Sequence, residues 1–309
     1  MPRDTSPARD PAFTLVLPVY NEERALPATI AHVRAVLDGA GRPYELLIVD
    51  DGSRDDTPRL LDALEGVRVI RHAENRGYGA ALKTGILAAT CSLVAVMDVD
   101  GTYPPEALPS LLDGCATADM AVGARVRARA VEGRLRSFVK WCFRLYARWI
   151  TNSPIPDLNS GIRAFHRPVV ERFLDVLPDG FSFTTTITVG ALVEGLVVRF
   201  EPVDYMPRIG VSKLRPVPDT FRIGRQLLRL GLRFAPLRTL VALGVPLATI
   251  AALTLRACSH EAVAAQTWLV GAGVLLSLVA VAGAAEWRAR RRRSEDGLRF
   301  ASHRRARPT

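Results

Sequence analysis

Short apolar runs and amphipathic segments alternate along the first hundred residues of the chain. Four of the runs have the length of β-strands and cover residues 13–17, 44–49, 67–70 and 93–97. Segments with helical spacing follow the first three runs, and the first of these segments places four apolar residues on one face: Leu26, Ile30, Val33 and Leu37. This alternation predicts an α/β fold, in which a mostly parallel sheet carries helices on both faces and binds its ligand beyond the carboxyl ends of the strands.

Basic and aromatic residues dominate the middle of the chain, where eight cations between Arg125 and Arg148 interleave with Phe, Trp and Tyr. A helix from about Leu135 to Ile150 would be amphipathic, with these residues at the depth of a membrane interface. The same pattern also fits a helix that packs on a core and exposes a basic face to water, and the sequence does not choose between the two. A second basic amphipathic helix is predicted over residues 216–235.

Two long uncharged segments follow, over residues 239–255 and 262–285. Their composition predicts two transmembrane helices within residues 236–286, of which the second has the stronger pattern. Arginine is dense before the first segment and after the second, so the positive-inside rule places both flanks and the N-terminal body in the cytosol. We expect the chain to be a multi-pass protein of the cell (inner or plasma) membrane, with a basic tail on anionic lipid.

Charge and cysteine content argue against several other classes of protein. The formal net charge is +10 at pH 7, and the segment from Trp287 to Thr309, with nine arginines and two acids, contributes 9 − 2 = +7 of it. Because the basicity belongs to the tail, nucleic acid is not an expected partner. The four cysteines have the spacing of neither a metal site nor a disulfide framework. The first eleven residues do not resemble a secretory signal.

Two carboxylates stand where the fourth apolar run ends. Asp98 and Asp100 are two residues apart, so at the end of a strand they point the same way, and Gly101 lets the backbone turn. Paired carboxylates suit Mg²⁺ or Mn²⁺ shared with substrate phosphates, although Asp and Gly are also typical of a simple turn. The second strand ends in acids as well, Asp50 and Asp51. Together with a glycine-rich turn and the later cations, they predict a site for a nucleotide diphosphate and a metal ion.

Several of these segments resemble the motifs of family 2 glycosyltransferases with the GT-A fold. The resemblance covers about residues 13–215 and rests on residues 17–23, 49–57, 75–77 and 98–106. Residues 160–165 and 208–213 resemble, more narrowly, polyprenyl-phosphate glycosyltransferases of the dolichyl-phosphate mannose synthase type. The resemblance implies an inverting, metal-dependent transfer of a sugar from a nucleotide-sugar, of the GDP-mannose or UDP-glucose type, to polyprenyl phosphate at the cytosolic membrane face.

The resemblance also implies roles for individual residues. The donor nucleotide would be bound by Pro18, Tyr20, Glu22, Asp51, Arg76 and Gly79. Asp98 and Asp100 would ligate Mg²⁺ or Mn²⁺, and Thr102, where relatives often carry Gln, would be a third ligand. The acceptor phosphate would be held by Arg125, Arg134, Arg136, Ser137, Arg208 and Lys213. Asp98, Asp100, Arg125 and Arg208 would form the catalytic group.

The predicted organisation has five parts: a flexible N-terminus (1–12), a cytosolic catalytic domain (13–215), an amphipathic juxtamembrane helix (216–235), a transmembrane hairpin (236–286) and a basic cytosolic tail (287–309). Two alternatives keep this fold. One is transfer to a hydroxyl of a glycolipid, which would need a carboxylate base, and Asp157 is the candidate. The other is a non-catalytic membrane scaffold with a retained nucleotide-binding body. The sugar, the base and the oligomeric state do not follow from the sequence, so a homo-oligomer stays open.

Overall fold

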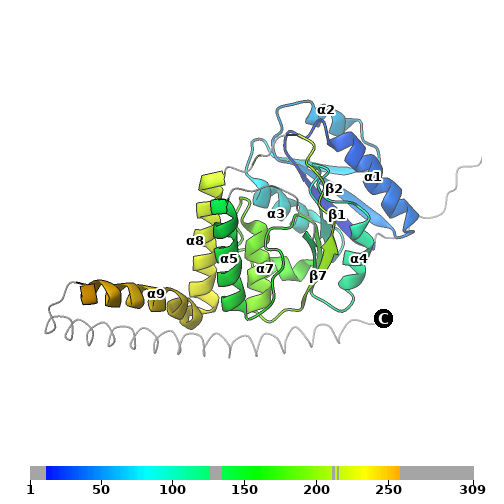
Figure 1. The fold of residues 1–309 in the computed structure, drawn as a ribbon. Coiled ribbons are helices and arrows are strands. Elements are labelled where there is room, and N and C mark those ends of the chain that lie inside the picture. The colour runs from blue at the N-terminus through cyan, green and yellow to red at the C-terminus, as the bar shows by residue number, and fades with distance from the viewer. Residues whose placement is uncertain (1–11, 126–133, 211–212, 214–215, 258–309) are drawn as a thin grey trace, which may run out of the picture.

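The structure, a computed structural model, describes residues 12–125, 134–210, 213 and 216–257 (Figure 1). Its centre is a twisted sheet whose strands are β1 (Phe13–Val19), β2 (Tyr44–Asp50), β3 (Arg68–Arg71), β4 (Leu93–Val96), β5 (Met120–Arg125), β6 (Arg163–His166) and β7 (Val198–Val203). β1 is buried along its whole length, as expected for a central strand covered on both faces.

The strands follow the order β3-β2-β1-β4-β6-β5-β7 across the sheet. β1 is parallel to β2 and β4, β2 is parallel to β3, and β5 is parallel to β7. β6 is antiparallel to both of its neighbours, β4 and β5. The prediction of a mostly parallel α/β sheet is therefore refined: the sheet is mixed, and the antiparallel strand β6 lies between the two parallel parts.

Helices cover both faces of this sheet. Their bounds are α1 (Leu26–Gly39), α2 (Thr57–Asp62), α3 (Tyr78–Ala88), α4 (Ala107–Gly114), α5 (Arg134–Thr151), α6 (Arg167–Glu171), α7 (Phe183–Val193), α8 (Pro216–Phe234) and α9 (Pro236–Ala257). The apolar sides of α1 and α4 pack on one face with a core that includes Ile30 and Leu111. Those of α3, α6 and α7 pack on the other face, around Leu82, Phe165 and Ile187.

A third apolar cluster joins α5, α7 and α8, the helices at the left of the body in Figure 1. Ile150 of α5, Val189 of α7 and Leu227 and Leu230 of α8 belong to it, and all four are buried. The amphipathic helix predicted over residues 135–150 is thus present and uses its apolar face for packing. α8, which is predicted as an amphipathic juxtamembrane helix, also packs on the body through this cluster.

α9 extends away from the body in Figure 1 and contains Pro246. It coincides with the first predicted transmembrane segment. Among the residues that the structure describes, no helix combines the length and the apolar character that a membrane span requires. The second predicted segment, residues 262–285, and the basic tail lie outside the described residues.

Candidate active site

The candidate site lies where β1, β2 and β4 end, because parallel strands bring their carboxyl ends to one edge of the sheet. Asp50 ends β2 opposite Val19 of β1. Asp98 and Asp100 follow β4 directly, and Gly101 turns the chain with a φ of 75°, a left-handed conformation that favours glycine. The pair predicted from the sequence is therefore present at the predicted edge.

Asp98 is held by residues from two distant parts of the chain. Its Oδ1 accepts a hydrogen bond of 2.8 Å from the hydroxyl of Tyr78, at the start of α3. The Tyr78 ring stacks on Phe181 with 5.5 Å between centroids. Gly161, just before β6, leaves room for the carboxylate, since a Cβ built there would lie 2.0 Å from Asp98 Oδ2. Tyr78 and Gly161 therefore fix the position of this carboxylate.

Asp100 is buried and both of its carboxylate oxygens are engaged. Oδ1 accepts hydrogen bonds from the amide of Thr102 at 3.0 Å and from its hydroxyl at 2.5 Å. Oδ2 lies 2.5 Å from Nη2 of Arg208. Thr102 thus orients Asp100, and Arg208 supplies a positive charge beside the pair.

The segment that carries Arg208 is tied to the turn after β4. The amide of Met206 donates to the carbonyl of Thr102, and the amide of Ile209 donates to that of Asp100, both at 2.9 Å. The Ile209 side chain covers Gly101, where a Cβ would stand 2.9 Å from Ile209 Cδ1. These contacts bring the predicted residue Arg208 to the two carboxylates across more than one hundred residues of sequence.

The electrostatics of the pair favour a bound cation. Burial first, and then the charge of Asp100, raise the pKa of Asp98 to about 7. The hydrogen bond from Tyr78 and the charges of Arg208 and Arg125 act in the opposite direction. Burial and the charge of Asp98 raise the pKa of the Tyr78 phenol, so its hydroxyl stays protonated and donates. Two adjacent carboxylates that repel each other in this way are a site that a divalent cation would stabilise.

The loops after β1 and β2 are joined to each other. The amide of Asn21 donates to Ser53 Oγ at 2.9 Å, and the amide of Arg54 donates to Asn21 Oδ1 at 2.7 Å. The amide of Glu22 donates to the hydroxyl of Thr57 at 2.9 Å. These bonds set the positions of Tyr20 and Glu22, two residues predicted to bind the donor nucleotide.

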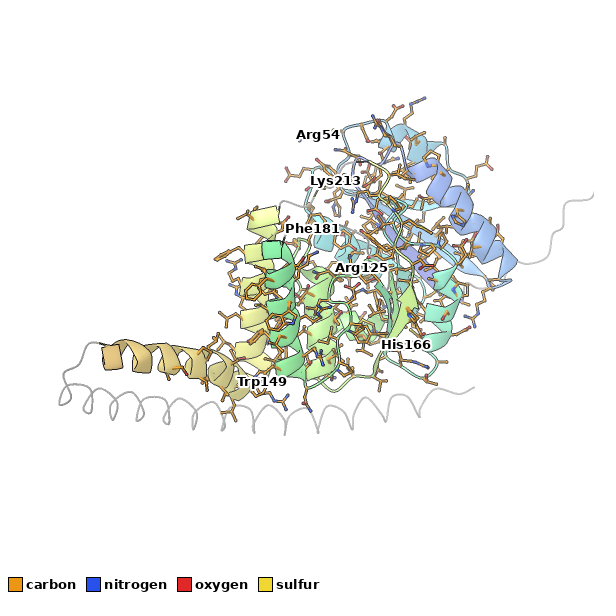
Figure 2. All side chains as sticks on the ribbon, viewed as in Figure 1. Arg54, Arg125, Trp149, His166, Phe181 and Lys213 are labelled. Atoms are coloured by element: carbon orange, nitrogen blue, oxygen red, sulfur yellow. The ribbon has the colours of Figure 1, made fainter. Side chains whose placement is uncertain are left out.

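Lys213 binds the loop after β1 through hydrogen bonds and an ion pair. Its Nζ donates to the carbonyls of Tyr20 and Asn21 and pairs with the Glu22 carboxylate. It also lies over the Tyr20 ring, 5.7 Å from the centroid. Burial raises the pKa of Glu22, and the hydrogen bond and charge of Lys213 oppose that rise. Lys213, predicted to bind the acceptor phosphate, therefore stands among the residues predicted to bind the donor; Figure 2 shows it above Arg125 in this view.

Asp51 was predicted to bind the nucleoside, and its buried carboxylate organises the loop before α3. Oδ1 accepts from His72 Nδ1 at 2.6 Å and from the amide of Arg76 at 2.9 Å. Oδ2 accepts from the amide of Gly77 at 2.8 Å. Arg76 itself is exposed. The carboxylate holds the backbone of residues 76 and 77, and thereby the start of the helix that carries Tyr78.

Arg125, predicted to bind the acceptor phosphate, forms a bidentate pair with Asp157. Its Nε and Nη2 donate to the two carboxylate oxygens at 2.6 and 2.7 Å, and its amide donates to Oδ2 at 3.2 Å. The guanidinium lies over the ring of Tyr205, 5.2 Å from the centroid. Burial would raise the pKa of Asp157, but the hydrogen bonds and charge of Arg125 outweigh it and lower that pKa.

Arg163, at the start of β6, is fully buried and makes no ion pair with a carboxylate of the described residues. Its Nη2 donates to the carbonyl of Ser160 at 2.6 Å, and its Nη1 donates to Thr184 and Thr188. Its Nε, also buried, has no hydrogen-bond partner among these residues. Arg163 thus anchors the turn at Ser160–Gly161 that faces Asp98.

The remaining predicted residues lie in different surroundings. Pro18 is buried inside β1, and Gly79 is required for packing because a Cβ there would stand 2.2 Å from the carbonyl oxygen of Pro178. Ser137 is exposed on α5. Arg134 and Arg136 open the same helix, but their side chains lie outside the described residues.

Several residues that position this site were not foreseen. Tyr78, Gly161 and Arg163 meet Asp98 or its surrounding turn only through the tertiary fold. The sequence indicates Asp157 only as a candidate base, whereas in the structure it is the partner of Arg125. The Ser160–Phe165 motif was the one sequence signal that could have found Gly161 and Arg163. Among the described residues, no group of three or more His, Cys, Asp and Glu side chains is arranged so that it could hold a metal ion.

The sequence of the chain is similar to the sequences of known glycosyltransferases. The sequence profile of glycosyl transferase family 2 matches residues 14–174. The undecaprenyl-phosphate 4-deoxy-4-formamido-L-arabinose transferase of Pseudomonas aeruginosa is 32% identical over 183 residues, which are 55% of this chain and 54% of that protein. The chain therefore spans about half the length of this relative. The polyprenol monophosphomannose synthase of Mycolicibacterium smegmatis is 31% identical over 240 residues, 69% of this chain and 87% of that one.

The fold is also similar to a solved structure. Glucosyl-3-phosphoglycerate synthase from Mycobacterium tuberculosis, in complex with Mn²⁺, uridine diphosphate and phosphoglyceric acid, superposes with a TM-score of 0.55. The two proteins are 21% identical, and the match covers 72% of this chain and 78% of the other. At this identity the likeness concerns the fold.

Proposed function

The chain belongs to glycosyl transferase family 2, and from this premise we propose that it transfers a sugar from a nucleotide-sugar to a polyprenyl phosphate, with inversion, at the cytosolic face of a membrane. The observation that carries the proposal is the carboxylate pair Asp98 and Asp100, placed at the strand ends with Arg208 beside it. The proposed acceptor class is the one named for the relatives from Pseudomonas aeruginosa and Mycolicibacterium smegmatis.

The residues of the site fit a divalent cation, Mg²⁺ or Mn²⁺, as the family implies. Asp98 and Asp100 would supply carboxylate oxygens, which are the ligands that these ions prefer. Gly161 leaves the space in which the Asp98 carboxylate sits, and Arg208 balances the charge of Asp100. When bound, the cation supplies Lewis-acid stabilisation of the leaving nucleoside diphosphate. A direct role of Thr102 as a third ligand stays a prediction, because its hydroxyl donates to Asp100 here.

The donor nucleotide is assigned to the joined loops after β1 and β2. Tyr20 and Glu22 are held there by Lys213 and by hydrogen bonds from the opposite loop. The aromatic ring and the carboxylate suit a base and a ribose, while the donor phosphates would extend toward Asp98 and Asp100. Neither the nucleoside nor the sugar is determined by these contacts.

An acceptor phosphate needs no catalytic base from the protein. A phosphate monoester has a second pKa near about 6 and is therefore largely dianionic at neutral pH. Arg208 is placed to attract this charge, whereas the charge of Arg125 is balanced by its pair with Asp157. Catalysis then consists of positioning the two substrates and balancing charge.

The alternative acceptor, a hydroxyl of a glycolipid, fits the site less well. A hydroxyl has to lose a proton, and Asp157 was the candidate base. That carboxylate has a lowered pKa and is engaged by Arg125 through both oxygens. A base with this environment holds protons weakly, which supports the proposal of an acceptor that is already ionised.

Membrane attachment is part of the proposal. α5 and α8 expose aromatic, aliphatic and basic side chains together, which is the composition of helices that lie in a membrane interface. A lipid acceptor would reach the site from that side. The two-helix hairpin over residues 236–286 and the cytosolic position of both termini stay predictions from the sequence.

The test is a transfer assay with membranes that contain the chain, labelled nucleotide-sugars, Mg²⁺ or Mn²⁺, and added polyprenyl phosphate. We expect a labelled lipid that mild acid hydrolyses, as a sugar linked to phosphate should be. Asp100→Ala should abolish its formation, whereas Asp113→Ala, which removes an exposed acid on α4, should not. Label that appears only on a glycolipid hydroxyl would overturn the choice of acceptor, and full activity of Asp100→Ala would remove the metal from the mechanism.

A further inference from the structure

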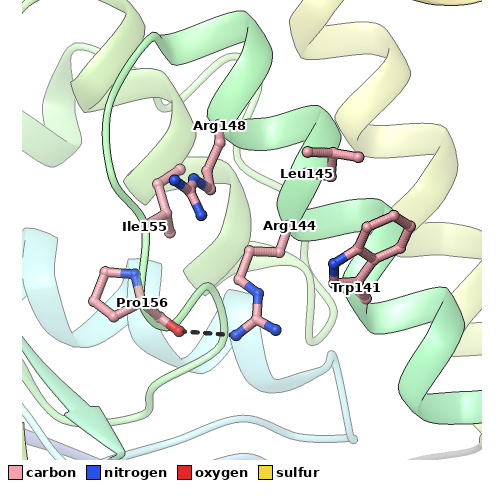
Figure 3. A pocket seen from close by; sticks show the side chains of 6 residues that line it. All are labelled: Trp141, Arg144, Leu145, Arg148, Ile155 and Pro156. Atoms are coloured by element: carbon pink, nitrogen blue, oxygen red, sulfur yellow. Dashed lines mark hydrogen bonds between the residues drawn. The ribbon is translucent and has the colours of Figure 1, made fainter.

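A hollow on the surface lies between α5 and the chain that follows it. Its volume is about 210 Å³, and it is lined by Trp141, Arg144, Leu145, Arg148, Ile155 and Pro156. Figure 3 shows both guanidinium groups directed toward the segment with Ile155 and Pro156. None of these residues belongs to the site around Asp98 and Asp100, so the hollow is a separate feature.

The hollow concentrates positive charge. Arg144 and Arg148 are both exposed and are four residues apart, so they project from the same side of α5 and repel each other. Arg144 Nη1 makes one long hydrogen bond, 3.5 Å to the carbonyl of Pro156. In the described part of the chain neither arginine pairs with a carboxylate, and the nearby Asp157 is taken by Arg125. A bound anion would relieve this repulsion.

The surroundings of the two arginines are apolar rather than polar. Trp141 and Leu145 are about half exposed, at 49% and 51%, and Ile155 forms a buried floor. Phe138 and Trp149 continue the exposed stripe along α5, and Val217 and Phe221 are exposed on α8. Such a surface is unfavourable in water but suits hydrocarbon next to charged headgroups.

We propose that this hollow binds the phosphodiester headgroup of an anionic membrane phospholipid, with the acyl chains along the exposed stripe of α5. Arginine binds phosphate oxygens through two parallel N–H groups, and two such groups face one space here. The sequence of α5 contains five basic residues and no acid, so its charge complements an anionic leaflet. The inference goes beyond the proposed transfer, because it concerns a bulk membrane lipid and not a substrate.

The binding can be measured on the full chain in a neutral detergent by native mass spectrometry, with phosphatidylglycerol and phosphatidylcholine as separate probes. We expect phosphatidylglycerol to bind at least tenfold more tightly, and Arg144→Gln/Arg148→Gln to remove that preference. The matched control is Arg225→Gln/Arg229→Gln on α8, which removes two exposed arginines at the same spacing outside the hollow and should keep the preference within twofold. Arg144→Lys/Arg148→Lys should retain part of it.

Two results would overturn the proposal. Equal losses in the α5 and α8 variants would mean that the lipid is attracted by the diffuse charge of the surface. Displacement of phosphatidylglycerol by polyprenyl phosphate, one for one, together with a raised acceptor KM in the α5 variant, would assign the hollow to the acceptor. Because lipid binding is measured without transfer, a failure of the proposed transferase activity would leave this measurement unaffected.

Discussion

A methyl group at position 161 tests the proposed metal site at its tightest point. Gly161 is not in the left-handed conformation that favours glycine, so alanine there does not introduce that backbone strain. The added Cβ of Gly161→Ala would stand 2.0 Å from Asp98 Oδ2 and 2.5 Å from its Cγ. The substitution therefore acts on the position of the Asp98 carboxylate and removes no charged group from the chain.

The size of the displacement follows from these contacts. A Cβ practically never approaches another heavy atom closer than 3.0 Å, so the carboxylate must retreat by at least 3.0 − 2.0 = 1.0 Å. The hydrogen bond of 2.8 Å from Tyr78 would be stretched or lost in the same movement. A misplacement of about 1 Å in an active site costs roughly 10²-fold in rate, or about 2.7 kcal/mol in the activation barrier.

We therefore expect Gly161→Ala to lower kcat/KM about 100-fold and to weaken Mn²⁺ binding. Steady-state transfer assays and calorimetric titration with Mn²⁺ measure the two quantities. Gly180→Ala is the matched control, since a Cβ at Gly180 meets no atom within 4 Å. If Gly161→Ala keeps both the rate and the Mn²⁺ affinity within twofold of the unmodified chain, the Asp98 carboxylate does not need this space and is not the metal ligand proposed here.

Three further predictions concern the groups around this carboxylate. Asp157→Asn leaves the partly buried Arg125 guanidinium without its counter-charge, so the free energy of unfolding should fall by about 2 kcal/mol, and denaturation in urea that shows less than about 0.5 kcal/mol would contradict the pairing. Lys213→Met removes the clasp on Glu22 and should raise the donor KM about tenfold with kcat nearly unchanged, whereas a change in the acceptor KM alone would return Lys213 to the acceptor. Burial and the neighbouring carboxylate raise the pKa of Asp98 to about 7. Protons should therefore compete with Mn²⁺ below that value, so the affinity rises up to tenfold per pH unit toward pH 7 and levels off above it. In the metal-free protein, the stabilisation from protonated Asp98 is complete below the ordinary aspartate pKa and is lost as the pH rises through 7. A metal affinity that does not change between pH 5.5 and 8.5 would remove Asp98 from the site.

The fold was predictable from the sequence where the signal is local. The strands β1, β2 and β4 each contain an apolar run that is buried in the fold, and the periodic apolar positions of α1 face the sheet as their spacing indicates. Asp98 and Asp100 come directly after β4, so their position at the edge of the sheet follows from strand direction alone. The amphipathic pattern likewise located α5 and α8 to within a few residues.

The sequence could not show contacts that depend on the pairing of distant segments. The insertion of β6 between β4 and β5 is a choice among strand orders, and its four residues are too short to encode that choice. Gly161 meets Asp98 only because of this insertion. Lys213 contacts Glu22, which is 191 residues away in the sequence. A local motif therefore could not show that Lys213 lies among the predicted donor-binding residues. The partly buried ion pair of Arg125 and Asp157 could not be predicted for the same reason, because the two residues are 32 positions apart in the sequence.

The antiparallel strand β6 also determines how this protein could be modified. β5 and β6 are paired neighbours, with Val122 opposite Arg163, so the segment from residue 126 to residue 162 leaves and rejoins the sheet at adjacent positions. That segment includes α5 with its hollow and its exposed stripe, while Asp98 and Asp100 lie outside it. For protein engineering, this segment is an exchangeable unit whose two ends join the same pair of antiparallel strands, β5 and β6. Exchanging it between related chains, with Asp157 and Gly161 within it kept unchanged, would change what the surface binds without moving the carboxylates.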